Sequence, residues 1–150
     1  MKRCISNLSL LALLLAGCGS SDRWKDGRPP VYPASGSVTM NGQPLEGATV
    51  IFSPEDPAGK PGVAITDKSG RFDAETFEPK DGLTAGPHKV TVEKTTLVDK
   101  QGNPVEVIRE PGDVKEVREV PKQYSNFSTS GLRVEVKDGK NEFPAFELKK

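Results

Sequence analysis

The sequence predicts an all-β protein: a seven-stranded antiparallel β-sandwich that follows an N-terminal export signal and a tether. Three observations support this prediction. From residue 36 onward, short apolar runs alternate with polar residues at a period of two, as strands with one buried face do. Turn signals rich in Asn, Asp and Gly separate these runs. No segment of the domain has the 3.6-residue periodicity of a long amphipathic helix.

The N-terminus has the three parts of a secretory signal. Lys2 and Arg3 precede an apolar segment over residues 5–16, and the small residues of Leu15-Ala16-Gly17-Cys18 close it. The apolar segment is shorter than the ~20 residues that a membrane-spanning helix needs. We therefore expect residues 1–17 to be a cleaved signal peptide.

The end of this signal is similar to the lipobox of bacterial lipoproteins, whose cysteine receives a diacylglycerol and becomes the new N-terminus. The resemblance implies lipidation of Cys18 and makes membrane lipid a partner. Buried acyl chains contribute about 0.8 kcal/mol per CH₂, and two chains suffice for stable anchoring. An ordinary signal peptide with an incidental cysteine is the alternative. Gly19, where an aspartate would favour the inner membrane, favours the outer membrane or cell surface, facing the periplasm or exterior.

Cleavage before Cys18 would leave 133 residues, with 19 Lys and Arg against 21 Asp and Glu. This balance gives no reason to expect nucleic acid as a partner. Cys4 lies in the removed segment, so acylation of Cys18 would leave no thiol for a disulfide, a metal site or a nucleophile. The remaining length suits one domain of about 100 residues and a spacer.

Residues 18–35 are predicted to be the acylated cysteine and a flexible tether. They are rich in Gly, Ser and Pro, carry scattered charge and lack apolar periodicity. Such a segment buries too little surface to offset the entropy of ordering it. Its large aromatic residues are Trp24 and Tyr32, and we expect Tyr32 to pack where the chain joins the domain.

The domain is assigned to residues 36–150 and opens with a hairpin. Val38 and Met40 share one face, and Asn41-Gly42 is the strongest hairpin signal because both residues accept the positive φ of a type I′ turn. The return strand is expected at residues 48–52. Its core-facing residues are Ala48, Val50 and Phe52.

Five further strands are expected at residues 63–66, 71–74, 88–93, 132–137 and 143–148. The first two flank residues 67–70, where Asp in the first position and Gly in the last fit a type I turn. In the third, Val90 and Val92 point inward. In the last, Pro144 lacks a backbone donor, which favours an edge strand or a bulge.

A long insertion at about residues 95–131 interrupts this rhythm. Residues 95–98 and 105–109 are expected to form a small hairpin. The three-residue spacing of Val114, Val117 and Val120 favours one helical turn, and Asp113 with Glu116 has the spacing of a capping box. Insertions of this length are usually functional or disordered.

Three stretches of the domain resemble the carboxypeptidase-regulatory-like, or transthyretin-like, domains. Residues 36–50 contain a strand, a turn, Gly-x-Pro-Leu and Gly-Ala; residues 66–72 form Thr-Asp-x-x-Gly-x-Phe; residues 82–92 form Gly-Leu-x-x-Gly-x-x-x-Val-x-Val. The C-terminal part, residues 121–148, resembles small bacterial lipoproteins of unassigned function. The resemblance implies a Greek-key, prealbumin-like sandwich that serves as a folding, spacing or binding module and is not itself catalytic.

The residue types that carry catalysis or bind metals are few or scattered. His88 is the only histidine and has no cysteine partner or recognisable Ser/Asp arrangement, so a structural or solvated role is expected. Several carboxylates near turns offer the oxygen ligands of Ca²⁺ but lack the alternating Asp pattern of calcium loops. They are Glu55, Asp56, Asp67, Asp73 and Glu75. We expect turn chemistry there, with no metal and no cofactor.

Tyr124 and Phe127 are the candidate partner-binding residues. Aromatic residues on loops can anchor a protein or stack on a sugar, but packing of the insertion on the sandwich explains both equally well. The sequence thus predicts a non-enzymatic, lipid-anchored envelope module that binds an unidentified envelope protein or glycan. An accessory or substrate-binding subunit of a secreted hydrolase or transport system is the alternative.

Overall fold

The computed structural model describes residues 27–105 and 114–150. In these residues the chain is all-β, as predicted, with thirteen strands and one short 3₁₀ helix, η1 (Lys122–Ser125). The signal at residues 1–17, Cys18 and Trp24 lie outside the described residues.

The strands of the first half are β1 (Val31–Tyr32), β2 (Ala34–Met40), β3 (Gln43–Pro44), β4 (Thr49–Pro54), β5 (Gly62–Ile65), β6 (Arg71–Asp73) and β7 (Leu83–Thr84). Those of the second half are β8 (Gly86–Glu93), β9 (Thr95–Val98), β10 (Lys115–Arg118), β11 (Leu132–Val136), β12 (Asn141–Glu142) and β13 (Phe146–Leu148). Regular structure begins before residue 36, because β1 pairs with β7. Tyr32 packs against the core, as expected.

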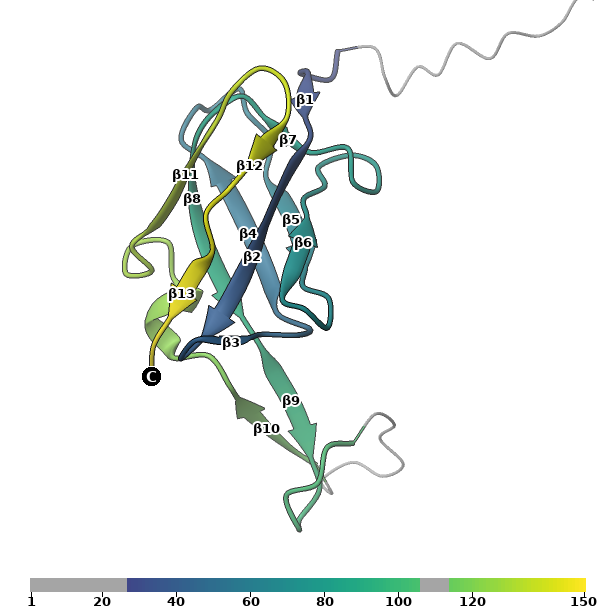
Figure 1. Cartoon of the computed structure of the whole chain (residues 1–150), viewed down its shortest axis with the longest axis vertical. Coiled ribbons are helices and arrows are strands. Elements are labelled where there is room, and N and C mark those ends of the chain that lie inside the picture. The colour runs from purple at the N-terminus through teal and green to yellow at the C-terminus, as the bar shows by residue number, and fades with distance from the viewer. Residues whose placement is uncertain (1–26, 106–113) are drawn as a thin grey trace, which may run out of the picture.

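Two larger sheets face each other across the core (Figure 1). One has four antiparallel strands in the order β11-β8-β4-β5. The other is built on β2, which pairs antiparallel with β3 and β6. β12 and β13 pair with β2 in parallel, a departure from the wholly antiparallel arrangement predicted. The departure arises because the chain leaves β11 in one sheet and enters the other beside β2.

The first predicted hairpin is present but has a different return strand. Asn41 and Gly42 have φ values of 50° and 80°, which confirms the positive φ expected at both positions. The return strand is the two-residue β3; the ladder is short because Pro44 has no N–H to donate. The predicted return strand at residues 48–52 was therefore wrong in its pairing: β4 crosses to the other sheet and lies between β5 and β8.

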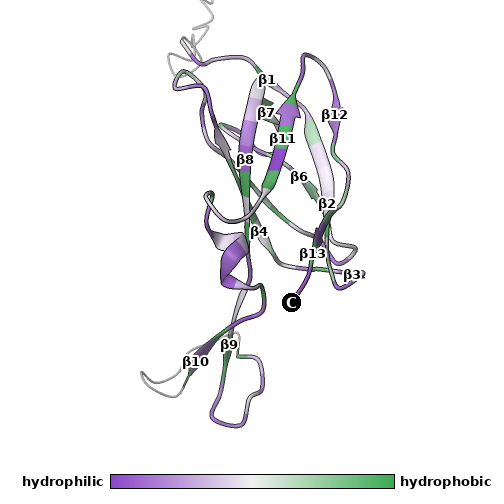
Figure 2. Ribbon diagram, turned by 90° about the vertical axis from the view of Figure 1, so that its left-hand side faces the viewer, coloured by the Kyte–Doolittle hydropathy of each residue, from purple (hydrophilic) through white to green (hydrophobic). Residues whose placement is uncertain are grey.

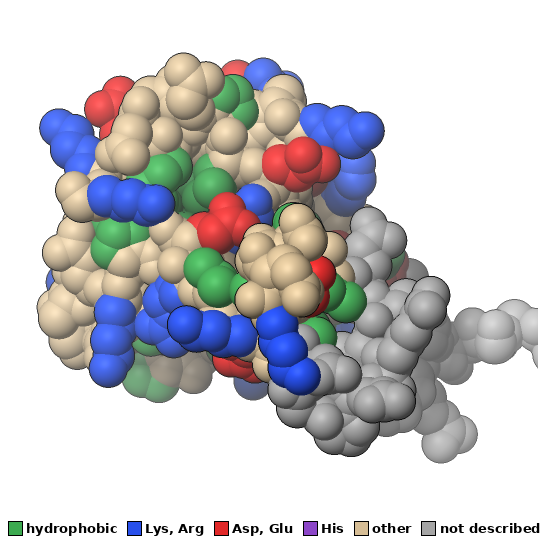
Figure 3. Space-filling model, turned by 90° about the horizontal axis from the view of Figure 1, so that it is seen from below, with side chains coloured by type: hydrophobic (Ala, Val, Ile, Leu, Met, Phe, Trp, Pro, Cys, Tyr) green, Lys and Arg blue, Asp and Glu red, His purple; other side chains and the backbone are tan. Residues whose placement is uncertain are grey.

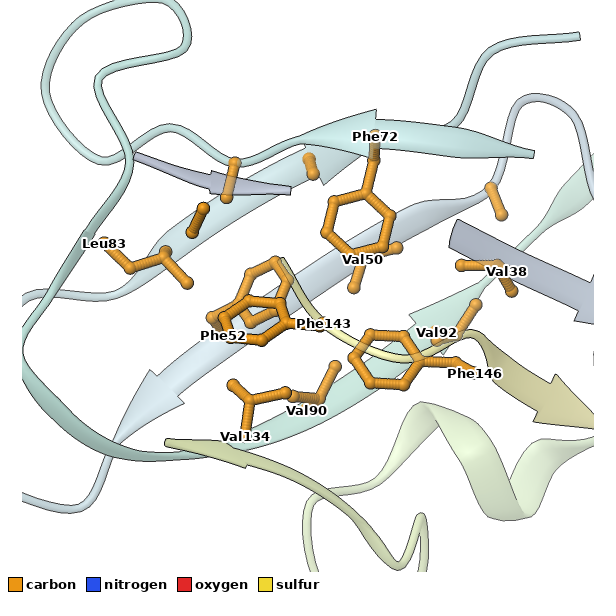
Figure 4. Close-up of a cluster of buried hydrophobic side chains, with 14 of the residues drawn as sticks. Val38, Val50, Phe52, Phe72, Leu83, Val90, Val92, Val134, Phe143 and Phe146 are labelled. Atoms are coloured by element: carbon orange, nitrogen blue, oxygen red, sulfur yellow. The ribbon is translucent and has the colours of Figure 1, made fainter. Parts of the chain in front are cut away.

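The core lies between the sheets, and contacts between phenylalanine rings run through it (Figure 4). The ring centroids of Phe52 and Phe72 are 5.8 Å apart, those of Phe52 and Phe143 6.3 Å, and those of Phe72 and Phe146 5.9 Å. The Phe52 contacts join β4 to elements of the opposite sheet. Val90 and Val92 are fully buried, as predicted. Burying each such side chain contributes about 1.5–3 kcal/mol.

The predicted turn at residues 67–70 is confirmed. The Gly70 N–H donates to the Asp67 carbonyl at 2.9 Å, and Gly70 has a φ of 73°. A Cβ at this glycine would lie 2.5 Å from the Val38 carbonyl oxygen, so the turn requires both the positive φ and the missing side chain. Pro144 also acts as predicted: it separates β12 from β13, and within the described residues both pair only with β2.

The insertion forms a ribbon that projects from one end of the sandwich (Figures 1 and 2). β9 lies at the predicted residues 95–98, and the Val105 N–H donates to the Leu97 carbonyl at 2.8 Å. This hydrogen bond and the bridge between Val98 and Pro104 close the loop after β9, but Val105 is not in a strand. The rest of the expected second strand, residues 106–109, lies outside the described residues. The helical turn expected through Val117 was wrong: residues 115–118 form β10, paired with β9. β-Branched side chains favour this paired, extended state.

Candidate interaction site

One strand of the ribbon, β10, is fully exposed, as is the two-residue β3. All four residues of β10 are exposed, and the ladder places Lys115 opposite Val98 and Val117 opposite Thr96. A two-stranded ribbon is only marginally stable by itself in water, so the fixation of its base is important. The exposed residues of β10 take no part in the core, so their backbone and side chains are available for contact with a partner.

Glu119 fixes the base of the ribbon. Its carboxylate lies 2.8 Å from the Lys94 ammonium, and it also accepts a hydrogen bond from the Thr96 hydroxyl. The Glu119 N–H donates to the Lys94 carbonyl at 2.9 Å, which continues the ladder towards the sandwich. Desolvation raises the pKa of Glu119, but the hydrogen bonds from Lys94 and Thr96 outweigh it and hold the pKa below its usual value. An ionised Glu119 therefore connects the two strands at the base of the ribbon.

Asp99 orders the loop that follows β9. Its carboxylate accepts hydrogen bonds from the backbone N–H groups of Gln101 at 2.9 Å and Asn103 at 2.8 Å, and from the Asn103 side-chain amide at 3.1 Å. The Asn103 side-chain hydrogen bond is the main cause that lowers the pKa of Asp99. The Asp99 carboxylate therefore stabilises the turn that contains Gln101 and Asn103.

The two predicted partner-binding aromatics have different environments. Tyr124 lies in η1, packs against the core, and its hydroxyl oxygen accepts a hydrogen bond from the Lys149 N–H at 3.1 Å. Phe127 follows η1 and is 38% exposed. Tyr124 therefore packs on the sandwich, and of the pair Phe127 is the one whose ring is exposed.

The ribbon end of the molecule is rich in basic side chains. Seen from below, Lys and Arg side chains form a band along one side of this end, with Asp and Glu beside it (Figure 3). The C-terminus lies here: the Lys150 N–H donates to the Asn41 side-chain oxygen at 3.2 Å, and Lys150 contributes to lowering the pKa of Glu119. Basic and acidic groups thus lie side by side near the ribbon.

Three of the five turn carboxylates line one polar cleft of about 300 Å³ between β5 and β6. They are Asp67, Asp73 and Glu75. Asp73 is paired with Lys80 at 3.2 Å, and Asp67 accepts hydrogen bonds from Ser69 and the Arg71 N–H, which lower its pKa.

The other two turn carboxylates lie apart from the cleft: Glu55 pairs with Arg133, and Asp56 accepts a hydrogen bond from the Ala58 N–H at 2.8 Å. In residues 27–105 and 114–150, no group of three or more His, Cys, Asp or Glu side chains is arranged to hold a metal ion.

His88 is 1% exposed and points into the interior from β8. Its Nδ1 lies 3.0 Å from the Gly86 carbonyl oxygen and its Nε2 lies 3.5 Å from the Thr84 hydroxyl. Burial lowers the pKa of this imidazole. This environment fits the structural role expected for it.

Cys18, the predicted lipidation site, lies outside the described residues, as do residues 1–17. Within the described part of the chain, no helix has the length and apolar character to cross a membrane.

Comparison with known proteins adds little. No family model matches the chain, and no curated protein matches it. A solved structure, the 9R-lipoxygenase from Cyanothece PCC8801, is 14% identical; the alignment covers 79% of this chain and 16% of that chain, with a TM-score of 0.37. At this TM-score the likeness carries no argument about fold or activity.

Sequence reasoning missed the exposed strand β10. The three-residue spacing of Val114, Val117 and Val120 predicts a helical turn, but only Val117 lies in β10, and the other three residues of this strand are charged. No alternation of apolar and polar residues marks the segment as a strand, so a search for the two-residue period does not find it.

Proposed function

We propose that this protein is a lipid-anchored envelope protein whose β-sandwich serves as a non-enzymatic interaction module. The lipobox-like sequence that ends at Cys18 supports the anchor. One structural observation carries the rest: the chain joins the sandwich at β1, at the end opposite to the projecting ribbon (Figure 1). An anchor before β1 holds that end near the membrane and presents the ribbon, with its basic surroundings, to an envelope protein or glycan.

The length of the tether supports this orientation. Arg28 already contacts the sandwich, since its guanidinium lies 5.0 Å from the centre of the Phe77 ring and 3.6 Å from the Glu78 carboxylate. Residues 19–27 separate the proposed anchor from Arg28, and nine residues span at most about 30 Å when fully extended. The β1 end is thus kept close to the lipid surface.

The finer fold is part of the same proposal. We infer a seven-stranded, Greek-key, prealbumin-like sandwich in which β12 and β13 together count as the last strand. The other six are β2, β4, β5, β6, β8 and β11. The sheet orders β5-β4-β8-β11 and β6-β2-β13 support this arrangement. The carboxypeptidase-regulatory-like resemblance of residues 36–50, 66–72 and 82–92 supports it from the sequence.

The anchor is tested by labelling cells with radioactive palmitate. The wild-type chain and Cys4→Ser are expected to incorporate label, because Cys4 lies in the predicted signal. Cys18→Ser is expected to lose it. Label that survives Cys18→Ser, or its absence from the wild type, contradicts the anchor.

The module is tested by crosslinking the full chain in intact cells. We compare the wild type with a variant in which residues 96–117 are replaced by a short Gly-Ser loop, after checking by thermal unfolding that the sandwich is intact. Loss of crosslinked envelope material from the variant supports the ribbon as the binding element. Unchanged capture contradicts it, and co-capture of one hydrolase or transporter favours the accessory-subunit alternative.

A further inference from the structure

The outer edge of β10 has unpaired backbone groups. Within the described residues, β10 pairs with β9 alone. The Val105 N–H donates to Leu97, so Leu97 directs its backbone groups away from β10. Glu116 lies opposite Leu97, and in an antiparallel ladder it must direct its own N–H and C=O away from β9. Arg118, two residues further on, points the same way.

The side chains along this edge are complementary to a second copy of themselves. Residues 115–119 are Lys-Glu-Val-Arg-Glu, with the charge order positive, negative, neutral, positive, negative. When two copies run antiparallel about Val117, Glu116 lies opposite Arg118 of the second copy and Lys115 lies opposite Glu119. Every charged position then faces the opposite charge, and such cross-strand pairs stabilise a sheet.

We propose that β10 is a homotypic docking strand: two copies of this chain pair their β10 edges antiparallel, with the two-fold axis at Val117. The proposed function makes the ribbon a binding element, and the pairing of two β10 strands names a second copy of the chain as one of its partners. The pairing rests on the proposed function only in this respect. Glu116 and Arg118 carry the outward backbone groups and face each other in this register. They therefore form a hydrogen-bonded pair on each side of the axis.

Charge selects this register over its neighbours. A shift of two residues in one direction places Glu116 opposite Glu116 of the second copy, and a shift in the other places Arg118 opposite Arg118. Like charges directly opposite each other destabilise a sheet. Charged residues on an edge strand ordinarily prevent it from pairing with another chain. In β10 the order of the charges allows pairing with a second β10, and only in the register centred on Val117.

Val117 supplies the apolar centre of the contact. It is one of four large hydrophobic side chains that are clearly exposed among the described residues, at 39%. On the axis it would meet its own copy in a non-hydrogen-bonded pair, where side chains approach most closely. Arg118 retains donors for this contact, because its hydrogen bond to the Ser125 hydroxyl, at 3.3 Å, uses only one of its terminal nitrogens.

The test introduces one cysteine into the full chain, with Cys4→Ser and Cys18→Ser, kept in detergent micelles under mild oxidation. Val117→Cys is expected to form a disulfide-linked dimer about tenfold faster than Lys115→Cys, because only residue 117 meets its own copy within the range of a disulfide. Residue 115 would lie about 13 Å along the strand from its copy. Equal rates, or no dimer from Val117→Cys, overturn the proposal.

Charge exchange in the Val117→Cys chain tests the register. Glu116→Arg alone and Arg118→Glu alone place like charges opposite each other, and each is expected to lower the dimer yield severalfold. The two together restore opposite charges and the yield. Single variants that dimerise as well as the parent, or a double variant that does not recover, overturn the proposal. Because Cys18 is absent throughout, none of these outcomes depends on the lipid anchor.

Discussion

The sandwich and the ribbon are both made of strands but are stabilised in different ways. In the sandwich, strands such as β4 turn one face to the core, with Val50 and Phe52 at 0% exposure. In the ribbon, which projects from the sandwich (Figure 2), β10 buries no residue. Its strands are held by their ladder and by the ion pair of Glu119 with Lys94. The core therefore determines stability, while the ribbon is free to present surface chemistry. Four predictions test this difference, in order of decreasing effect.

Phe52→Ala should destabilise the protein most. The ring contacts Phe72 and Phe143 from the other side of the core, and its removal leaves a cavity between the sheets. We expect a loss of about 3–5 kcal/mol in the free energy of unfolding, measured by urea denaturation. Ile65→Ala is the control, because Ile65 is 69% exposed, and should change it by about 0.5 kcal/mol or less. Similar losses for the two would refute the assignment of the core.

Gly70→Ala should lower the free energy of unfolding by about 2 kcal/mol or more. The alanine would have to adopt a left-handed φ, and its Cβ would clash with the Val38 carbonyl. Gly131→Ala is the matched control. Gly131 has a similar φ of 67° but nothing within 4 Å of the added Cβ, so only the backbone strain of about 1 kcal/mol applies. Thermal unfolding of both variants measures the difference. Equal costs would show that the turn at residues 67–70 is not closely packed on β2.

His88 should make the sandwich sensitive to mild acid. Its folded-state pKa is lowered by burial, so the unfolded chain binds a proton first as the pH falls. Stability is therefore expected to decline as the pH drops below the unfolded value of about 6.5, and to level off below the folded pKa. His88→Gln should flatten this decline in unfolding measured between pH 7 and 5. An NMR titration of this single histidine that gives an ordinary or raised pKa would contradict the buried placement.

Glu119→Gln should loosen the ribbon and leave the sandwich unchanged. The Lys94–Glu119 pair is partly exposed, so its loss costs at most about 0.5 kcal/mol. Hydrogen exchange of the β9 and β10 amides should speed up, while global unfolding stays the same. Glu116→Gln, an exposed neighbour, is the control and should leave exchange in the monomer unaltered. A global loss from Glu119→Gln would mean that the ribbon and the sandwich unfold together.

The sequence predicted what depends on neighbouring residues. Positive φ at Asn41 and Gly42, the turn before Arg71 and the inward face of β8 all follow from local conformational preference and the two-residue period of a strand. The candidate carboxylates were found for the same reason, because they belong to turns. That Asp67, Asp73 and Glu75 line one cleft required the packing of β5 beside β6.

The partner of each strand was decided by the tertiary structure. β4 has the pattern of a core strand in either sheet, and only the space between β5 and β8 assigns it to the four-stranded one. The three-residue spacing of Val114, Val117 and Val120 favours a helical turn, but pairing with β9 makes residues 115–118 a strand. Local sequence determines which way a side chain points, because that depends on adjacent dihedral angles. Which strand lies alongside depends on closing a core between residues far apart in the chain, and only the folded structure satisfies that condition.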